Sequence, residues 1–438
     1  MFRELLPPSF LDEAQRTASV TRNNSLYTPL VVMWLMVAQR LHGAASLEAA
    51  VVELLRGLPT SFWPNPCKRV RRWQQNGELP SSNTGAYNQA RQQLPLSVVE
   101  QSCDCIFDQL ATRMKETVSE EATQAFLLDG SSMRMAHSPS LCKLYPPGSN
   151  VHGEGHWPLV RILVAHDLYT GLAMRPEWGA MHGPEAVSEQ GLLEQCINRL
   201  PTGSAVIGDA NFGVFSVAWA AAGRQHPVVL RMTVARAQPL AGGPLHDDID
   251  REVVWKPSRY DRKAHPDLPA DACVRGRLIV RKVQPDNRAA PFLLPLFTTL
   301  PSEKAFALYG QRWAIETDLR TLKSTLCLDQ LTCTTPDMVA KEIQLGVTAY
   351  NLVRAVIALA SHQSGIPPRG YSFTKVRRIV EAFGPALANA PDQGAAQQIF
   401  DQMIKLIDQS KLPRRRRKRP SYSRTVWKRG GTFPNRTR

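Results

Sequence analysis

The stretch Tyr309-Gly310-Gln311-Arg312-Trp313-Ala314-Ile315-Glu316, continued to Lys323, decides the fold of this 438-residue sequence. Apolar residues at helical spacing predict one long helix over residues 302–327. Four polar side chains then fall within about 60° of one another at about 100° per residue: Tyr309, Arg312, Glu316 and Lys323. This stripe is not a core face, and the apolar residues beside it argue against an ordinary solvated face. An ion pair between Arg312 and Glu316 would explain only two of the four, and contributes a few tenths of a kcal/mol.

Two aspartates each follow a short apolar run. Asp129 follows Ala125-Phe126-Leu127-Leu128, and Asp209 follows Ala205-Val206-Ile207-Gly208. Each run predicts a buried strand, although a single strand ending in aspartate is often followed only by a turn. Together they indicate more, because the carboxyl ends of parallel strands are where α/β sheets bind ligands. We therefore expect both aspartates to share a site with Glu316, on a helix packed across that edge.

Three carboxylates in one site indicate a hard divalent cation. Mg²⁺ prefers oxygen ligands, and Mn²⁺ is the expected substitute. Two such ions, about 3.5–4 Å apart, would clamp an in-line phosphoryl displacement. Arg312 and Lys323 would then contact the phosphates. The sequence thus predicts metal-dependent chemistry on a nucleic acid.

The order of the expected elements predicts an α/β protein preceded by helices. Helical spacing over residues 30–41 and 47–58 gives way, from about residue 124, to short strands that alternate with helices. We predict five segments: a helical N-terminal domain (1–118), the first part of the catalytic domain (119–234), a β-rich insertion (235–291), the second part of the catalytic domain with the Glu316 helix (292–365), and C-terminal helices with a basic tail (366–438).

Positive charge gathers at the C-terminal end. The formal net charge is +15, and residues 411–438 hold twelve Lys and Arg without any Asp or Glu, which leaves about +3 for the rest. Six cations stand in a row between two prolines: Arg414, Arg415, Arg416, Arg417, Lys418 and Arg419. A basic tail on a nearly neutral body predicts nucleic acid as the partner. The alternative is a tail that only increases solubility.

The remaining composition predicts a cytoplasmic protein without a membrane segment. The eight cysteines include no CxxC pair, which favours free thiols in a reducing compartment. The N-terminus lacks the pattern of a secretion signal. The most apolar stretch, residues 29–38, is too short to span a bilayer.

The spacing Tyr-x2-Arg-x3-Glu-x6-Lys over residues 309–323 resembles the signature of insertion element 4-like DDE transposases. Leu127-Leu128-Asp129-Gly130 resembles the motif of the family's first aspartate. Ile207-Gly208-Asp209-Ala210-Asn211-Phe212-Gly213 resembles that of the second, with Asn211 where a glycine is common. Gly85-Ala86-Tyr87, continuing to Leu94-Pro95, resembles the family's N-terminal domain.

This resemblance implies a ribonuclease H-like catalytic fold with a β-strand insertion before Glu316. It implies Asp129, Asp209 and Glu316 as the catalytic metal ligands and Mg²⁺ as the cofactor. It also implies a homodimer on double-stranded DNA, both the element ends and the target, with the helical residues 1–118 as the DNA-binding domain, and association with the bacterial nucleoid. Trp313 would stack on DNA bases, although ordinary packing is an equal alternative.

The expected reaction has two steps. Water attacks a phosphodiester at the element end and frees a 3′-OH, which then attacks target DNA in the same site. An aromatic of the insertion, with Trp255 as the residue to test, would hold a base flipped from the duplex. Two alternatives stay open: a metal-dependent nuclease of the same fold, and a catalytically inactive DNA-binding protein.

Overall fold

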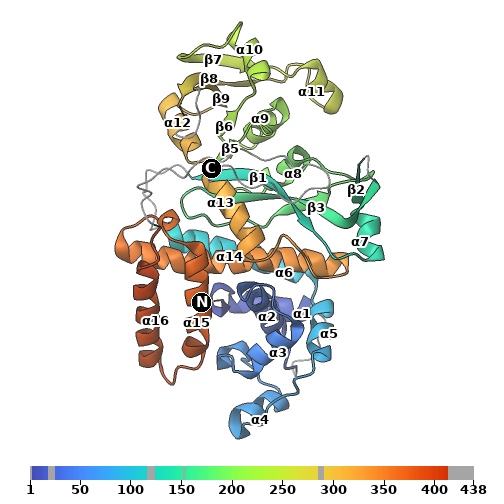
Figure 1. The fold of residues 1–438 in the computed structure, drawn as a ribbon, viewed down its shortest axis with the longest axis vertical. Coiled ribbons are helices and arrows are strands. Elements are labelled where there is room, and N and C mark those ends of the chain that lie inside the picture. The colour runs from blue at the N-terminus through green and yellow to red at the C-terminus, as the bar shows by residue number, and fades with distance from the viewer. Residues whose placement is uncertain (1, 18–24, 116–123, 151–152, 285–290, 413–438) are drawn as a thin grey trace, which may run out of the picture.

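The computed structural model describes residues 2–17, 25–115, 124–150, 153–284 and 291–412, shown in Figure 1. The basic run at 414–419 lies outside them. Within the described residues, nine strands form one sheet in the order β2-β3-β1-β5-β6-β9-β8-β7, and β4 pairs with β3 outside that path. The strands are β1 (Ala125–Arg134), β2 (Pro147–Asn150), β3 (Gly153–Asp167), β4 (Glu177–Ala180), β5 (Ala205–Gly208), β6 (Val228–Arg231), β7 (Ile249–Trp255), β8 (Val274–Val283) and β9 (Phe292–Thr298).

Helices surround this sheet and build the part of the molecule below it in Figure 1. Before the sheet come α1 (Pro8–Thr17), α2 (Pro29–Leu41), α3 (Leu47–Leu55), α4 (Lys68–Asn76), α5 (Gly85–Gln93) and α6 (Leu96–Met114). Between the strands lie α7 (Pro139–Leu144), α8 (Glu189–Ile197), α9 (Phe215–Ala222), α10 (Val234–Ala241) and α11 (Arg259–Ala264). After them come α12 (Ser302–Gly310), α13 (Ala314–Arg320), α14 (Pro336–Ser364), α15 (Phe373–Ala388) and α16 (Gln393–Asp408). The protein is therefore a mixed α/β structure.

The centre of the sheet is parallel and buried. β1 runs parallel to β5, and β5 runs parallel to β6. Residues 125–128 and 205–208 are all buried, which explains their unbroken apolar runs. The predicted strand at 205–208 is confirmed. β1, however, does not end at Leu128 but continues to Arg134, because its antiparallel pairing with β3 extends that far.

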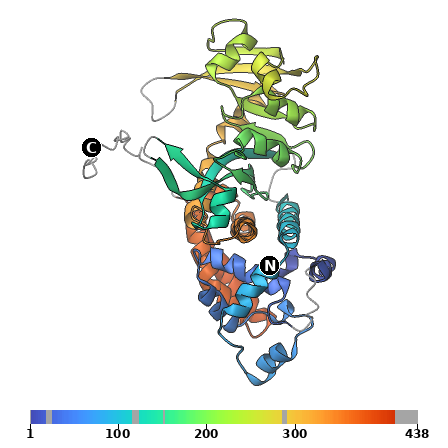
Figure 2. The same cartoon turned by 90° about the vertical axis from the view of Figure 1, so that its right-hand side faces the viewer.

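The β-rich insertion extends the central sheet instead of forming a sheet of its own. β9 pairs with β6 on one side and with β8 on the other, and β7 forms the edge. Strands were expected at 252–255 and 277–283, and both are longer. The insertion also contains α10 and α11. Figures 1 and 2 show that this part of the sheet lies at one end of the molecule and α4 at the other.

The helix α14 is the central helix of the core. Among the described helices it alone has the length and composition of a membrane span, and 94% of its most apolar window is buried inside the protein. It packs against α2, α6, α15 and α16. The Tyr350 hydroxyl donates a hydrogen bond to the carbonyl of Gly171 at 2.9 Å, and the Asn351 side chain bonds the backbone of Ala173 at 2.8 Å. α14 therefore connects the helical layers to the turn after β3.

The prediction of one helix over residues 302–327 is wrong. α12 ends at Gly310, turns occupy 311–313, α13 follows, and a π-helical turn, η4 (Thr321–Thr325), ends the segment. The four polar positions of the stripe therefore lie on two helices, a turn and a π-helical turn. Such irregular turns rotate the residues that follow, so a constant 100° per residue does not hold across them.

Candidate active site

Asp129, on β1, and Asp209, directly after β5, lie at the same level of two neighbouring strands. β1 and β5 pair in parallel with Leu127 level with Ile207. Two residues further along each strand are the two aspartates, where the parallel pairing has ended. The antiparallel partner β3 continues past Asp129, opposite Val164, and keeps this part of β1 extended. The sheet thus brings two carboxylates together that are 80 positions apart in the chain.

The surroundings of Asp129 raise its pKa to about 6. Burial is the largest cause, and the negative charge of Asp209 is the next, with a further contribution from Glu189. The backbone N–H of Gly130, 2.9 Å from Oδ1, and the charge of Arg312 act in the opposite direction. A carboxylate whose ionisation is opposed by burial and by other carboxylates is a group that a bound cation would stabilise.

The loop after β5 holds Asp209 by short-range hydrogen bonds. Its Oδ1 accepts from the backbone N–H of Asn211 at 2.8 Å. Arg236, on α10, donates to the carbonyl of Ala210 at 2.9 Å. The side chain of Asn211, in this loop, is itself bonded, because its amide donates to the Glu189 carboxylate at 2.6 Å.

Glu316 faces the same pocket as Asp129. The pocket has a volume of about 700 Å³ and is lined by residues of β1, α13 and η4. The Glu316 side chain is 43% exposed and accepts a hydrogen bond from Arg312 at 3.2 Å. Within the described residues, no three acidic, His or Cys side chains lie close enough together to hold one ion. The two aspartates therefore lie near each other, whereas Glu316 lies on the wall of the pocket and is bonded to Arg312.

The other residues of the stripe also gather near the aspartates. Lys323 donates to the Ser131 hydroxyl on β1 at 3.1 Å. Tyr309 is buried, and this burial raises the pKa of its phenol, with smaller effects from Arg312 and Asp209. Trp313 is 69% exposed, so it is not a packing residue in this chain. The Arg312 guanidinium lies 5.7 Å from the centre of the Trp313 ring.

Trp255 does not have the position that base flipping would require. It is on the face of β7 opposite Val254, as expected, and that face is the buried one. Its ring contacts Phe297 edge-on at 4.8 Å and Phe215 at 6.0 Å. Trp255 is therefore a core residue that joins the insertion to α9, and the expectation that it holds a flipped base is wrong.

A buried charge network that the sequence did not indicate fixes α13. Asp318, two residues after Glu316, is fully buried and paired with Arg354 at 2.5 Å and Arg369 at 2.7 Å. His166, on β3, lies 3.9 Å from the same carboxylate. Burial alone would raise the pKa of Asp318, but the two arginines hold it below its usual value. The network fastens α13 to α14 and to β3, and so sets where Glu316 stands.

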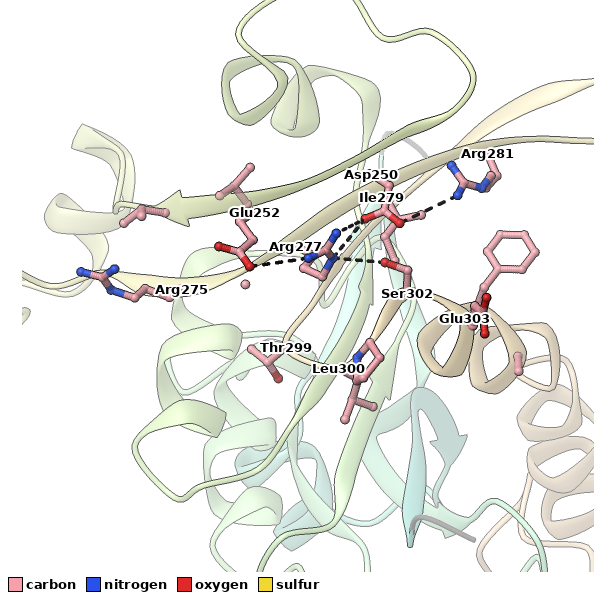
Figure 3. Close-up of a pocket in the computed structure, with 16 residues that line it drawn as sticks. Asp250, Glu252, Arg275, Arg277, Ile279, Arg281, Thr299, Leu300, Ser302 and Glu303 are labelled. Carbon is pink, nitrogen blue, oxygen red and sulfur yellow. Dashed lines mark hydrogen bonds and ion pairs between the residues drawn. The ribbon is translucent and has the colours of Figure 1, made fainter. Parts of the chain in front are cut away.

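A second pocket, of about 1250 Å³, lies elsewhere, against β7, β8 and α12 (Figure 3). Arg277 bonds Asp250 at 2.8 Å and Ser302 at 3.2 Å, and Arg281 lies 3.9 Å from the Asp250 carboxylate, as Figure 3 shows. Arg281 also pairs with Asp248 at 2.9 Å. Its arginines are thus largely matched by carboxylates, so the groove offers little net charge to a phosphate. It contains none of the three predicted acidic residues.

Comparison with known proteins identifies the class to which this fold and this site belong. Residues 120–352, more than half of the chain, match the family described as "Transposase DDE domain", and the chain therefore belongs to the DDE transposases. Over 322 residues it is 26% identical to "Transposase InsG for insertion sequence element IS4" of Escherichia coli (strain K12), covering 70% of this chain and 68% of that protein. The resemblance to insertion element 4-like transposases is confirmed, and the protein is a transposase of an insertion sequence.

Proposed function

We propose that this transposase cleaves DNA at the ends of its element and joins the freed 3′-OH to target DNA, with Asp129, Asp209 and Glu316 as metal ligands. The observation that carries the proposal is the level placement of the two aspartates, with the pKa of Asp129 raised to about 6. Glu316 faces the pocket that Asp129 lines. All three donors are carboxylate oxygens, which suits Mg²⁺, or Mn²⁺ in its place.

The chain's own residues would divide the work. A bound divalent cation would polarise the phosphate and activate the nucleophile. Lys323, bonded to β1 beside the aspartates, is placed to hold a phosphate of the cut strand. Arg312 pairs with Glu316 and is placed to move to a phosphate when the carboxylate turns to a metal ion. Trp313, exposed beside it, offers a ring on which a base can stack.

We further propose that residues 119–234 and 292–365 form a ribonuclease H-like catalytic domain. Supporting this, β4, β3 and β1 pair antiparallel, and β5 and β6 continue the sheet parallel to β1. Residues 235–291 are the insertion, and 366–412 contribute α15 and α16. Family membership supports a homodimer on DNA and a place at the bacterial nucleoid.

Residues 1–118 would be the domain that recognises the element ends, and α4 is its most suitable element. Only Val70 of this helix is fully buried, and Trp73 packs edge-on against Trp63 at 5.8 Å. Four cations of α4 are exposed, Lys68, Arg69, Arg71 and Arg72, and the helix contains no acidic residue. α4 also lies at an end of the molecule (Figures 1 and 2).

The helical arrangement separates two kinds of DNA contact. At about 100° per residue, Lys68, Arg72 and Gln75 are opposite the buried face. Arg69 and Arg71 lie on the two flanks. A helix in the major groove, about 12 Å wide, turns its centre to the base edges and its flanks to the two backbones. Arg72 and Gln75 are therefore the candidates for reading bases, and Arg69 and Arg71 for holding phosphates.

Substitution of the acidic residues tests the chemistry. Asp129→Asn, Asp209→Asn and Glu316→Gln should each abolish cleavage with Mg²⁺ while element-end binding is retained, because each removes a ligand charge and little volume. Joining of a pre-cut 3′-OH end separates a transposase from a nuclease. Cleavage at nearly the wild-type rate by any one variant would remove that residue from the metal site.

Substitution of α4 tests the recognition. Arg72→Ala and Gln75→Ala should weaken binding to element ends by about 1–3 kcal/mol per contact and leave random DNA largely unaffected. Arg69→Ala should weaken both alike and reduce the salt dependence by about one contact. Equal losses on both DNAs for all three variants would show that α4 only attracts the backbone.

A further inference from the structure

A fourth carboxylate lies beside the two aspartates. Glu189 is the first residue of α8, which follows its N-cap Ser188. Its side chain is 23% exposed, and its charge contributes to the raised pKa of Asp129. The sequence gives no local signal for it, since it belongs to neither aspartate motif and stands 20 residues before Asp209.

Both oxygens of Glu189 have partners. Oε2 accepts a hydrogen bond from the side-chain amide of Asn211 at 2.6 Å. Oε1 lies 4.0 Å from the guanidinium of Arg161 on β3. The next residue, Gln190, donates to the backbone carbonyl of Asn211 at 2.6 Å. The start of α8 therefore holds the loop of Asp209 by two short hydrogen bonds to one residue.

Glu189 also touches the strand of the other aspartate. A side chain at Gly130, the residue after Asp129, would overlap the Glu189 carboxylate and its methylene carbon. Only glycine at this position lets the Glu189 side chain lie against β1. The same carboxylate thus contacts the neighbour of Asp129 and the loop of Asp209.

We propose that Glu189 is a positioning residue of the metal site, which clamps the Asp209 loop to β1 so that the two aspartates stay level. The proposal rests on the proposed function, in which these aspartates are metal ligands. Glu189 is treated as a positioning residue and not as a ligand, because its Oε2 is bonded to Asn211 and, among the described residues, it forms no three-carboxylate group with the aspartates. Asn211, the departure from the family pattern, is the partner through which it acts.

Calorimetric titration of the purified full-length protein with MnCl₂, without DNA, tests this. Glu189→Ala and Asn211→Ala should each weaken Mn²⁺ binding by about tenfold, the usual effect of losing a residue that orients a ligand. The double variant should be no weaker than either single one, because the two residues form one bond. Glu189→Gln, whose side-chain oxygen can still accept from Asn211, should retain most of the affinity. Glu194→Gln, at an exposed position of the same helix, is the control and should match the wild type.

The contact between Glu189 and Gly130 allows a second test of the proposal. Gly130→Ala should lower the melting temperature and the Mn²⁺ affinity, because its methyl group displaces Glu189. Adding Glu189→Ala should restore the melting temperature, since the methyl group then has room, without restoring the affinity.

The outcomes are distinct. Wild-type Mn²⁺ affinity in Glu189→Ala, with or without a lowered melting temperature, would overturn the proposal. An equal loss of Mn²⁺ affinity in Glu189→Gln and Glu189→Ala would also overturn it, because the charge of Glu189, and not its bond to Asn211, would then account for the loss. Absence of Mn²⁺ binding by the wild-type protein would instead overturn the proposed function, and this inference with it.

Discussion

Asp129 is buried, which raises its pKa, and the charge of Asp209, directly after the neighbouring parallel strand β5, raises that pKa further. Without a metal ion, folding therefore disfavours the ionised form of the Asp129 carboxylate. This relationship makes the proposed ligands testable through stability as well as through activity.

Asp129→Asn should stabilise the metal-free protein at pH 8. The pKa of Asp129 is about 6 in the folded chain against 3.8 for the ordinary group. Ionisation is thus disfavoured in the folded state, and the loss of stability develops as the pH rises from about 4 to above 6. After allowance for partial exposure, the variant should gain about 1–2 kcal/mol at pH 8. Urea unfolding at several pH values measures this, and the gain should shrink below pH 6. A variant less stable than the wild type at pH 8 would contradict the argument.

Mg²⁺ should raise the melting temperature of the wild type and not that of Asp129→Asn or Asp209→Asn. A ligand that binds only the folded state stabilises it by about 2.7 kcal/mol at 100 times its Kd. Glu316→Gln should retain part of the effect, because Glu316 is paired with Arg312 and lies apart from the aspartates. Thermal scans with Mg²⁺, and with NaCl of matched ionic strength as the control, measure it. Equal shifts in all four proteins would place the ion elsewhere.

Arg312→Ala and Lys323→Ala should impair cleavage and joining more than folding. The Arg312–Glu316 pair is partly exposed and contributes only about 0.2–1 kcal/mol. Among the described residues, the Lys323 side chain makes one hydrogen bond, to Ser131. Cleavage and strand transfer on an end substrate, measured beside the melting temperature, separate the two roles. Normal activity with a lowered melting temperature would show that both residues are structural.

Asp318→Asn should destabilise the fold by about 3–5 kcal/mol, because it removes the negative charge that pairs with the buried Arg354 and the partly buried Arg369. Denaturant unfolding gives the value, and Thr317→Ala, at an exposed neighbouring position, is the control. A loss below about 1 kcal/mol would mean that Arg354 and Arg369 find other partners.

Deletion of residues 412–438, of which 413–438 lie outside the described structure, should flatten the salt dependence of DNA binding. If about five of the tail's cations contact phosphates, the slope of log affinity against log salt should change by about 4 to 5, at about 0.9 per contact. Element-end and random DNA should be affected alike, and cleavage at saturating DNA should persist. An unchanged slope with reduced solubility would favour a solubilising tail instead.

The sequence indicated the parts of the fold that local patterns determine. β5 was predicted to the residue, because an apolar run between Ser204 and Asp209 leaves little choice. All eight cysteines are free, as their spacing indicated. The stripe over residues 309–323 was predicted on the assumption of one continuous helix. That assumption is wrong, since a turn and a π-helical turn interrupt the helix.

What the sequence missed depends on contacts between distant segments. The length of β1 follows from β3, which pairs with it to Arg134. Trp255 is buried because Phe297 and Phe215 come from elements on both sides of the insertion. Glu189 and Asp318 carry no local signal, because their partners are on other elements.

The position of β9 has a consequence for the chain as it leaves the ribosome. β6 pairs with β5 on one side, but its partner on the other side, β9, forms only when residues 296–298 have been made, so one edge of β6 stays open while the whole insertion is made. At about 5–20 residues per second, Glu316 follows Asp209 by about 5–20 s. A premature stop codon between β6 and β9 would release a chain that keeps α4 and both aspartates but lacks the third acidic residue. Such a fragment would carry an unpaired β6 edge into the cell, where aggregation or proteolysis would compete with any binding to DNA.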